Sequence, residues 1–460
     1  MSAREAMNQT SGSGRVERFF ERLADITIIF LIFGAVFLFI YLAARYALIK
    51  PASRVLLFCL PLMSAGLVAL LRFPRLKVPA ALTAISLLFP LYLFETIQWA
   101  WVDRTASPHE VVSGDARSKM QVVHDLREQG KDVSMFINLV LLQAKTFDHV
   151  FPMNINGQNI IPLSGASFKT TVLCRESKAW AVYESDEHGF NNPAGLYKPG
   201  EVDIAILGDS FMHGDCVSSE NTVGALLRKS YPRTISLGIG GAGPLTRFAV
   251  FREYVEVLKP KIVLYVYTQN TLDRIGNEAL LRTYLNASFR QGLYSLQPQL
   301  DEGYEHIFRT AEDAWEESKR EDRPSDWLWI KMLLLKRTQA EIENFWNRRK
   351  EHRTREDGHA GNLEILWTTL SEIKSLTLSW GGRLIFVYLA TPSHGGSPDR
   401  EEILSVVRPL SVDIIDLSQA FERVGDPSTI YSHKGGHFNE YGYSIVAETI
   451  ANVIRGADAE

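Results

Sequence analysis

The chain has 460 residues, of which 46% are apolar, and a formal net charge of −4 at pH 7. This length is enough for about two or three structural units. The slightly acidic balance argues against a nucleic-acid partner, because nucleic-acid-binding surfaces are basic.

Residues 1–23 form a polar N-terminal segment, and residues 24–102 contain three apolar runs without a charged residue: Ile26–Ala44, Val55–Leu71 and Val78–Phe94. A bilayer core needs roughly 20 apolar residues per helix, with about 17 as the lower limit. A secretory signal has a single, shorter apolar core. We therefore predict three transmembrane helices, with a buried helical hairpin as the alternative for the second and third runs. Trp99 and Trp101 suit an interfacial aromatic belt.

The basic residues near these runs predict an orientation. One side of the membrane would carry Arg4, Arg15, Arg18, Arg22, Arg72, Arg75 and Lys77, and the other Lys50, Arg54 and Arg104. Because cytoplasmic loops carry the excess of Lys and Arg, the N-terminus is expected in the cytoplasm of a bacterial inner-membrane protein. Residues 103–460 would then lie in the periplasm or outside the cell.

The chain has three cysteines, of which Cys59 lies in the second apolar run. Cys174 and Cys216 fall in the expected exported part, where a disulfide persists. Sequence alone does not give the distance between them. A disulfide and two separate buried thiols therefore both stay open.

Residues 201–460 show strand-like apolar runs alternating with helical patterns. The runs are Asp203–Leu207, Thr234–Leu237, Lys261–Tyr267, Arg383–Ala390 and Val412–Leu417, and the helical stretches between or after them are Glu220–Ser230, Leu245–Leu258, Asn362–Trp380 and Tyr441–Arg455. Near-continuous apolar strands alternating with helices predict a five-stranded parallel sheet covered on both faces, a three-layer α/β/α domain. Active-site loops are expected at the carboxyl ends of the strands.

Two stretches lie outside this alternation. Residues 103–200 lead from the membrane to the first strand with weak periodicity, and residues 184–193 within them read as a polar turn, with an approach to the active site as the alternative. Residues 275–358 form a charged, helical insertion. Its apolar stripe is expected to pack internally, with docking to a membrane-protein partner as the alternative; the stripe is Trp327, Ile330, Leu333 and Leu334.

Polar and glycine-rich blocks follow successive strands. The first strand ends in Gly208-Asp209-Ser210, the second in a glycine-rich exit around Gly241, and the third shortly before Asn270. His437 stands ahead of the last helical stretch. Together these residues supply a nucleophile, oxyanion donors and a general base at strand ends. His213, three residues beyond Ser210, is expected on the surface, with a place in the pocket lining as the alternative.

In the order and spacing of these four blocks, from about Val202 to the C-terminus, the chain resembles the SGNH/GDSL hydrolase superfamily. The resemblance implies cleavage or transfer of ester-linked acyl groups. It implies that Ser210 is the nucleophile, that its N–H, Gly241 and Asn270 form the oxyanion hole, and that His437 is the base.

The chain departs from that family pattern three residues before the histidine, where an acidic residue is usual and Lys434 stands instead. Loss of the acid costs a serine triad about four orders of magnitude in rate. A Ser-His dyad, or substitution by Asp426, Glu440 or an acid of the insertion, are the alternatives, and no spacing selects one. Asp209 is expected to order its own loop.

The sequence thus predicts a membrane-anchored esterase or acetyl transferase that acts on an acylated carbohydrate or similar ester in the envelope. The competing interpretation is a degenerate domain that lost its chemistry and serves as a membrane-tethered assembly subunit. No cofactor is predicted. No metal site is predicted either, because the glycines between His433 and His437 favour a loop over a zinc-binding helix face.

Overall fold

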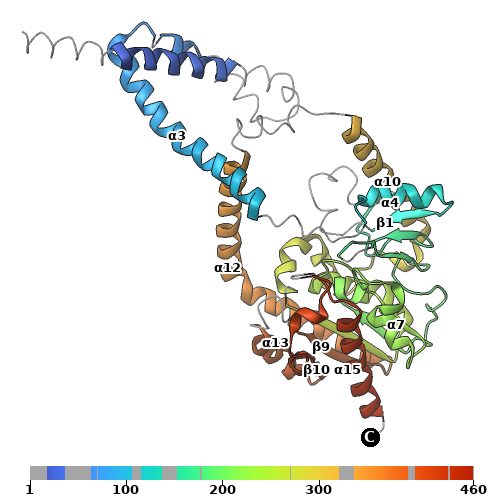
Figure 1. Cartoon of the computed structure of the whole chain (residues 1–460). Helices are drawn as coiled ribbons and strands as arrows, with labels where there is room; N and C mark the ends of the chain where they lie inside the picture. The colour runs from blue at the N-terminus through green and yellow to red at the C-terminus, as the bar shows by residue number, and fades with distance from the viewer. Residues whose placement is uncertain are drawn as a thin grey trace, which may run out of the picture. The chain divides into compact units, whose positions relative to one another are not determined.

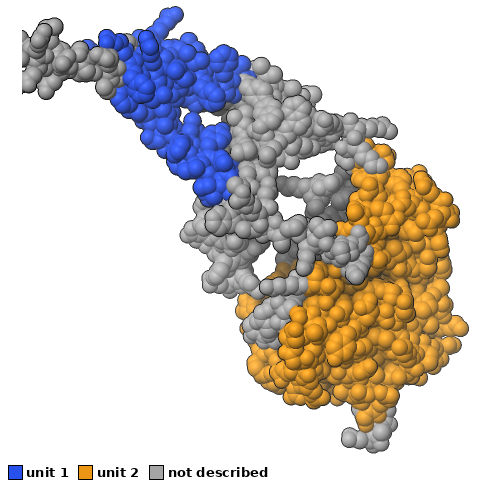
Figure 2. Space-filling model, in the orientation of Figure 1, with its two compact units in different colours: residues 1–108, 323–346 blue, residues 109–322, 347–460 orange. Residues whose placement is uncertain are grey.

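The computed structural model describes residues 18–36, 64–69, 71–105, 115–136, 153–176, 179–269, 271–320, 336–391, 399–433 and 436–458 (Figure 1). The chain divides into two compact units, which Figure 2 colours separately. Unit 1 comprises residues 1–108 and 323–346, and unit 2 comprises residues 109–322 and 347–460.

Unit 1 is helical in its described part. Residues 18–36 and 64–69 are helices, and α3 (Pro74–Thr105) is the longest helix that lies wholly within this unit. Among the described residues, one helix is long and apolar enough to cross a membrane, over Arg75–Ile97. It covers the third expected span. Of the first two expected spans, residues 37–44 and 55–63 lie outside the described part, so those spans stay predictions.

The helices of unit 1 expose large apolar side chains and bury a few polar ones. The exposed set on α3 includes Leu76, Leu82, Leu87, Phe89, Leu93, Phe94 and Ile97. Lys77 Nζ lies 2.9 Å from Asp25 Oδ1. Glu95 is fully buried, and its Oε2 accepts bonds from both the backbone N–H and the hydroxyl of Thr338, each at 2.7 Å. A carboxylate in so apolar a helix needs such partners.

Unit 2 is built on a five-stranded sheet in the order β10-β9-β8-β6-β7, and every neighbouring pair is parallel. The strands are β6 (Ile204–Leu207), β7 (Thr234–Ser236), β8 (Ile262–Thr268), β9 (Arg383–Leu389) and β10 (Asp413–Asp416). The predicted parallel sheet is confirmed, and no strand end differs from its expected position by more than one residue. All residues of β6 and β8 are buried, so both faces of the sheet are covered.

Helices connect these strands. After β6 come α6 (Ser210–His213) and α7 (Val223–Arg228), and after β7 a continuous helical run forms α8 (Pro244–Val250), the π-helical turn η3 (Phe251–Val255) and α9 (Glu256–Leu258). Towards the C-terminus come α13 (Arg400–Val407), the 3-10 turn η8 (Arg408–Leu410), α14 (Ser418–Glu422), the 3-10 turn η9 (Pro427–Ile430) and α15 (Glu440–Asp458), which packs against α7.

Residues 115–200 form small sheets ahead of β6. The helix α4 (Lys119–Glu128) precedes a three-stranded sheet of β1 (Val133–Met135), β4 (Thr170–Val172) and β5 (Val182–Glu184), and a hairpin joins β2 (Met153–Ile155) to β3 (Gln158–Ile160). Strands of only three residues explain why the sequence shows weak periodicity here. The Ser118–Gln121 capping box starts α4.

The insertion between β8 and β9 is helical, as predicted, but its end differs. It contains the 3-10 segments η4 (Leu272–Leu285) and η5 (Leu293–Ser295), then α10 (Gln297–Arg320) and α12 (Lys336–Ser379). The boundary expected at residue 358 falls inside α12, because Gly358 and Gly361 interrupt the sequence pattern without ending the helix. The stripe from Trp327 to Leu334 lies outside the described residues.

Candidate active site

Ser210 stands directly after the first strand of the sheet. The chain leaves β6 through Gly208, where an added Cβ would come within 2.3 Å of Met212 Cγ, so the tight turn requires glycine. Asp209 caps α6 and accepts the N–H of Phe211 at 3.1 Å. Its carboxylate also accepts the Thr268 hydroxyl and lies 3.4 Å from the Arg247 guanidinium. Asp209 therefore orders the loop that presents Ser210.

The glycine-rich exit of β7 lies beside this loop. Gly241 has φ +81°, a conformation that favours glycine, and it lines the same pocket as Ser210. Glu278 holds the following helix in place, since it accepts the backbone N–H groups of three residues at the start of α8: Gly243, Leu245 and Thr246. Asn270, the third expected oxyanion donor, lies outside the described residues. Its neighbours Gln269 and Thr271 line the pocket.

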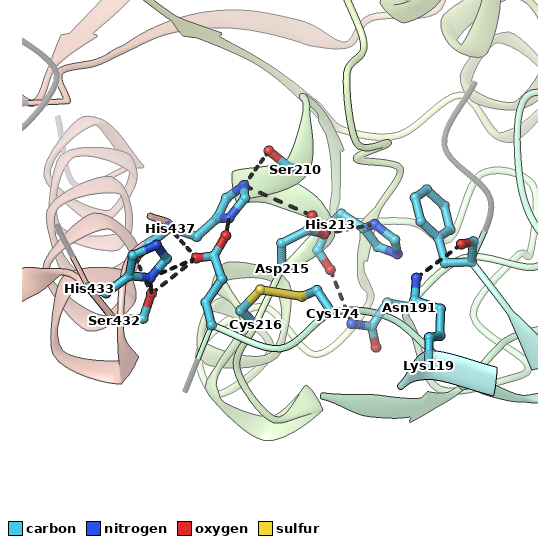
Figure 3. Close-up of a disulfide and its surroundings, with 12 residues drawn as sticks. Lys119, Cys174, Asn191, Ser210, His213, Asp215, Cys216, Ser432, His433 and His437 are labelled. Atoms are coloured by element: carbon cyan, nitrogen blue, oxygen red, sulfur yellow. Dashed lines mark hydrogen bonds and ion pairs between the residues drawn. A yellow bond between two sulfur atoms is a disulfide. The ribbon is translucent and has the colours of Figure 1, made fainter. Parts of the chain in front are cut away.

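His437 lies on the loop that precedes α15 and meets Ser210. Its Nε2 is 2.8 Å from Ser210 Oγ, which is hydrogen-bond distance (Figure 3). The ring also packs against Phe211, with ring centroids 5.1 Å apart. The structure thus brings together a hydroxyl and an imidazole that are separated by more than two hundred residues in the chain.

A carboxylate contacts the other nitrogen of the histidine, and it comes from Glu176. Glu176 Oε1 lies 2.8 Å from His437 Nδ1, while Oε2 accepts the His437 backbone N–H at 2.6 Å and the Ser432 hydroxyl at 3.1 Å. A carboxylate in this position fixes the imidazole tautomer with Nδ1 protonated and leaves Nε2 free to face the serine. Ser210, His437 and Glu176 therefore have the geometry of a serine triad.

The acids that the sequence offered do not contact His437. Asp426 caps η9 by accepting the Ser428 N–H at 2.9 Å, and Glu440 is exposed in the first turn of α15. Glu176 belongs to neither the insertion nor the last block but to the lead-in segment. Lys434 lies outside the described residues. The carboxylate that contacts His437 thus comes from a distant part of the chain and not from the position three residues before the histidine.

The charges around the triad shift two pKa values in opposite directions. Burial alone would raise the pKa of Glu176, but the bonds and charge of His437 and the Ser432 hydroxyl lower it to about 2. Burial alone would lower the pKa of His437, but the Glu176 bond and the charges of Asp215, Glu176 and Asp209 raise it to about 9. The imidazolium form is therefore strongly stabilised at this site.

A disulfide links the segment that carries Glu176 to the segment that carries Ser210. Cys174 and Cys216 are bonded, with Cα atoms 5.4 Å apart (Figure 3). Cys174 is two residues from Glu176, and Cys216 is six residues from Ser210. Cys216 has φ +69°, a left-handed conformation that is unfavourable for a non-glycine residue. The disulfide therefore restrains both the acid and the strained loop behind the nucleophile.

A second buried polar group supports this loop. His213 is 3% exposed rather than at the surface as expected; its Nδ1 lies 3.1 Å from Asp215 Oδ1, and its Nε2 lies 3.2 Å from the Tyr183 hydroxyl. The other Asp215 oxygen is 3.9 Å from His437 Nε2. Residues 184–193 form a turn, as expected, but most of them are buried, and Asn191 donates to the His213 carbonyl at 3.1 Å. This segment therefore supports the loop that follows Ser210.

The pocket beside Ser210 is small and largely polar. Its volume is about 140 Å³, well below the roughly 300–1,000 Å³ of pockets for drug-sized ligands. It is lined by Asp209, Ser210, Phe211, Gly241, Ala242, Thr268, Gln269, Thr271, Arg274, Thr391, Gly436 and His437. A short acyl group fits such a volume, whereas these residues provide no long apolar channel for a fatty chain.

Glu176, Cys216 and His437 also present potential ligand atoms within 4.8 Å of one another. The thiolate is the form of cysteine that binds metals, and Cys216 is bonded to Cys174 here. The two other side chains are already hydrogen-bonded to each other. The donor set of this cluster therefore does not fit a metal ion while the disulfide is intact.

Sequence reasoning missed Glu176 because nothing near it in the chain indicates chemistry. The signal that points to it is the pair of cysteines. A bond between Cys174 and Cys216 would have placed the acid two residues away close to the serine, but the pairing was undecided from sequence.

Comparisons with known proteins give a distant likeness. No protein-family model and no curated protein matches the chain.

Solved structures that resemble the chain are acylhydrolase, lipase and esterase folds. A putative acylhydrolase from Bacteroides fragilis is 14% identical with a TM-score of 0.30, covering 57% of this chain and 92% of its own. A two-domain esterase active on acetylated mannans, crystallised with mannopentaose, is 12% identical with a TM-score of 0.32, covering 56% and 50% respectively. The lipase/acylhydrolase from Enterococcus faecalis is 14% identical with a TM-score of 0.30, covering 56% and 96%. At these TM-scores the likeness carries no information about substrate.

Proposed function

We propose that this chain is a serine-dependent esterase or acyl transferase that acts on short, ester-linked acyl groups such as acetyl. The observation that carries the proposal is the hydrogen-bonded series Ser210 Oγ, His437 Nε2, His437 Nδ1 and Glu176 Oε1, with both contacts at 2.8 Å. A nucleophile, a base and an orienting carboxylate in one series are the parts of a serine triad.

The reaction proceeds in two steps, acylation of Ser210 and deacylation of the acyl-serine. Ser210 Oγ attacks the ester carbonyl and gives its proton to His437 Nε2, while the Ser210 N–H, the Gly241 N–H and the Asn270 amide hold the oxyanion. The intermediate collapses to an acyl-serine as Nε2 returns the proton to the leaving alcohol. Water or a second hydroxyl then attacks the acyl-serine and gives its proton to His437 Nε2. The acyl–Oγ bond breaks as Nε2 returns this proton to Ser210 Oγ, which gives a free acid or a new ester.

Glu176 acts on this cycle through the imidazole. Its charge stabilises the imidazolium that forms when Nε2 takes the serine proton, and its bond to Nδ1 keeps the ring in the productive orientation. The pocket volume of about 140 Å³ supports an acetyl-sized acyl group. The choice between water and a sugar hydroxyl as acceptor depends on what reaches the acyl-serine, and an acylated envelope carbohydrate is the donor class we propose.

A fluorophosphonate probe tests the proposal, because it reacts with an activated serine. Wild-type protein should be labelled, and Ser210→Ala should not. Failure of the wild type to label, under conditions that label a control serine hydrolase, would instead favour the interpretation as an assembly subunit. The sequence argument for that interpretation is the missing acid at Lys434, and the contact between Glu176 and His437 supports the enzyme instead.

We further propose that the chain is a multi-pass protein of the bacterial inner membrane with unit 2 outside the cytoplasm. The exposed apolar side chains of α3 and the helix over Arg75–Ile97 support insertion in a bilayer. The disulfide supports an oxidising compartment. Partner binding through residues 275–358 is proposed on the sequence alone.

Alkaline phosphatase fusions test this topology, since that enzyme is active only after export. A fusion after Arg75 should be inactive and a fusion after Asp115 active. The reverse pattern, or activity at neither position with stable fusion protein, would contradict the proposed orientation.

A further inference from the structure

Three described residues with ionisable side chains line the pocket beside Ser210, and they differ in whether other protein groups bind their charge. They are Asp209, His437 and Arg274. Asp209 accepts the Phe211 N–H and the Thr268 hydroxyl and lies near the Arg247 guanidinium. His437 is held between Ser210 and Glu176. Two of the three charged groups therefore already have protein partners.

The guanidinium of Arg274 is the group that has no such partner among the described residues. The backbone N–H of Arg274 donates to the Thr271 carbonyl at 3.3 Å, but its guanidinium makes no hydrogen bond or ion pair with any residue in the described ranges. Glu278, four residues further on, is engaged instead by the three backbone N–H groups at the start of α8. Glu278 is thus occupied, and Asp273, which directly precedes Arg274 in the chain, is exposed and forms no ion pair with the Arg274 guanidinium. The positive charge of Arg274 therefore stays available at the pocket.

The stem of Arg274 is fixed close to the proposed oxyanion site. An added Cβ on Gly243 would come within 2.7 Å of the Arg274 Cβ, so the two residues are in close contact, and Gly241 and Ala242 of the same loop line the pocket. Arg274 is half-buried, which leaves it open to a ligand. Arg247 is by contrast buried; its guanidinium donates to the Thr271 hydroxyl at 3.0 Å and lies 3.4 Å from the Asp209 carboxylate.

We propose that Arg274 binds an anionic group of the acylated substrate, a carboxylate or a phosphate, beside the ester that Ser210 attacks. Guanidinium binds both anions through paired hydrogen bonds and is preferred for that reason at anion sites. The inference rests on the proposed esterase or acyl-transferase function and makes Arg274 a specificity-determining residue. It places the substrate among acidic rather than neutral acylated carbohydrates.

Kinetics with matched substrates test this role on the full chain in mild detergent. Acetylated oligosaccharides would be compared in neutral, uronate and phosphorylated forms. Arg274→Ala should lower kcat/KM for one or both anionic forms by about 10- to 100-fold, the range expected for loss of a charged hydrogen bond, and change the neutral form little. Arg274→Lys should retain part of the preference. Arg282→Ala is the control, because Arg282 is exposed on the same segment η4 outside the pocket.

A binding experiment with a variant that lacks the nucleophile tests the role of Arg274 independently of the proposed esterase or acyl-transferase function. In the Ser210→Ala background, calorimetry with deacylated oligouronate and with a phosphorylated oligosaccharide should show binding that Arg274→Ala removes and that salt weakens. Whichever of the two ligands binds shows whether the anionic group of the substrate is a carboxylate or a phosphate. Absence of binding by both anions, or binding that Arg274→Ala leaves unchanged, overturns the role of Arg274 even where acetyl esters are cleaved. Retained anion binding without any Ser210-dependent chemistry would refute the esterase proposal alone.

Discussion

Glu176 Oε1 lies 2.8 Å from His437 Nδ1, although 261 positions separate the two residues in the sequence. Glu176 precedes the first strand of the five-stranded sheet, and His437 follows the last. The carboxylate that contacts the imidazole thus comes from the segment between β4 and β5, ahead of the five-stranded sheet in the chain.

Replacement of Glu176 should separate chemistry from folding. Glu176→Gln keeps the shape of the side chain but removes the charge that stabilises the imidazolium. We expect kcat for a small acetyl ester to fall by about 10³- to 10⁴-fold with little change in melting temperature. Asp426→Asn is the matched control, because Asp426 caps η9 away from His437. Near wild-type turnover in Glu176→Gln would show that Ser210 and His437 act without the acid.

The pH profile should report the raised pKa of His437. The base must be neutral to accept the serine proton, and its pKa in the free protein is about 9. The neutral fraction therefore grows as pH rises, and kcat/KM should increase from pH 7 and level off above about pH 9. Glu176→Gln should move this midpoint to lower pH, because the loss of the carboxylate removes the bond that raises the pKa. A wild-type profile that is already level at pH 7 would contradict the assignment.

Loss of the disulfide should affect both stability and rate. The bond closes a loop with a sequence separation of 42 residues, for which chain entropy predicts roughly 4 kcal/mol of stabilisation. The double replacement Cys174→Ser and Cys216→Ser should lower the melting temperature and reduce kcat, because the loop of Glu176 loses its tie to the loop of Ser210. Cys59→Ser is the control. Unchanged kcat in the double variant would mean that the acid is positioned by its hydrogen bonds alone.

Glu95 should stabilise unit 1 through Thr338. Its carboxylate is fully buried and accepts two bonds from that residue. Glu95→Ala leaves a buried N–H without a partner, so we expect a loss of about 1–3 kcal/mol, measured by unfolding in detergent. Thr338→Val removes only the hydroxyl bond and should cost less. A double-mutant cycle should show coupling between the two sites, and strictly additive losses would argue against the contact.

The local patterns of the chain were enough to place the sheet. Apolar runs such as Lys261–Tyr267 are long, β-branched and bounded by turn residues, so their strand character follows from composition. The positions of Ser210 and Gly241 after strands also follow, because parallel strands bring their carboxyl ends to one edge. The strands β1 to β5 could not be predicted, because each has only three residues and so short a strand gives almost no periodic pattern of apolar residues.

The α/β architecture and the placement of Ser210 and Gly241 after successive strands could thus be derived from the chain alone, because each depends on neighbours in the sequence. Tertiary packing was needed to show that Cys174 bonds to Cys216, that His213 is buried and that Glu176 contacts His437. It also showed that Arg274 lines the pocket with no partner for its guanidinium among the described residues. These facts depend on which distant segments pack together. Packing of that kind is fixed by the summed burial of many side chains, and no single spacing along the chain records it.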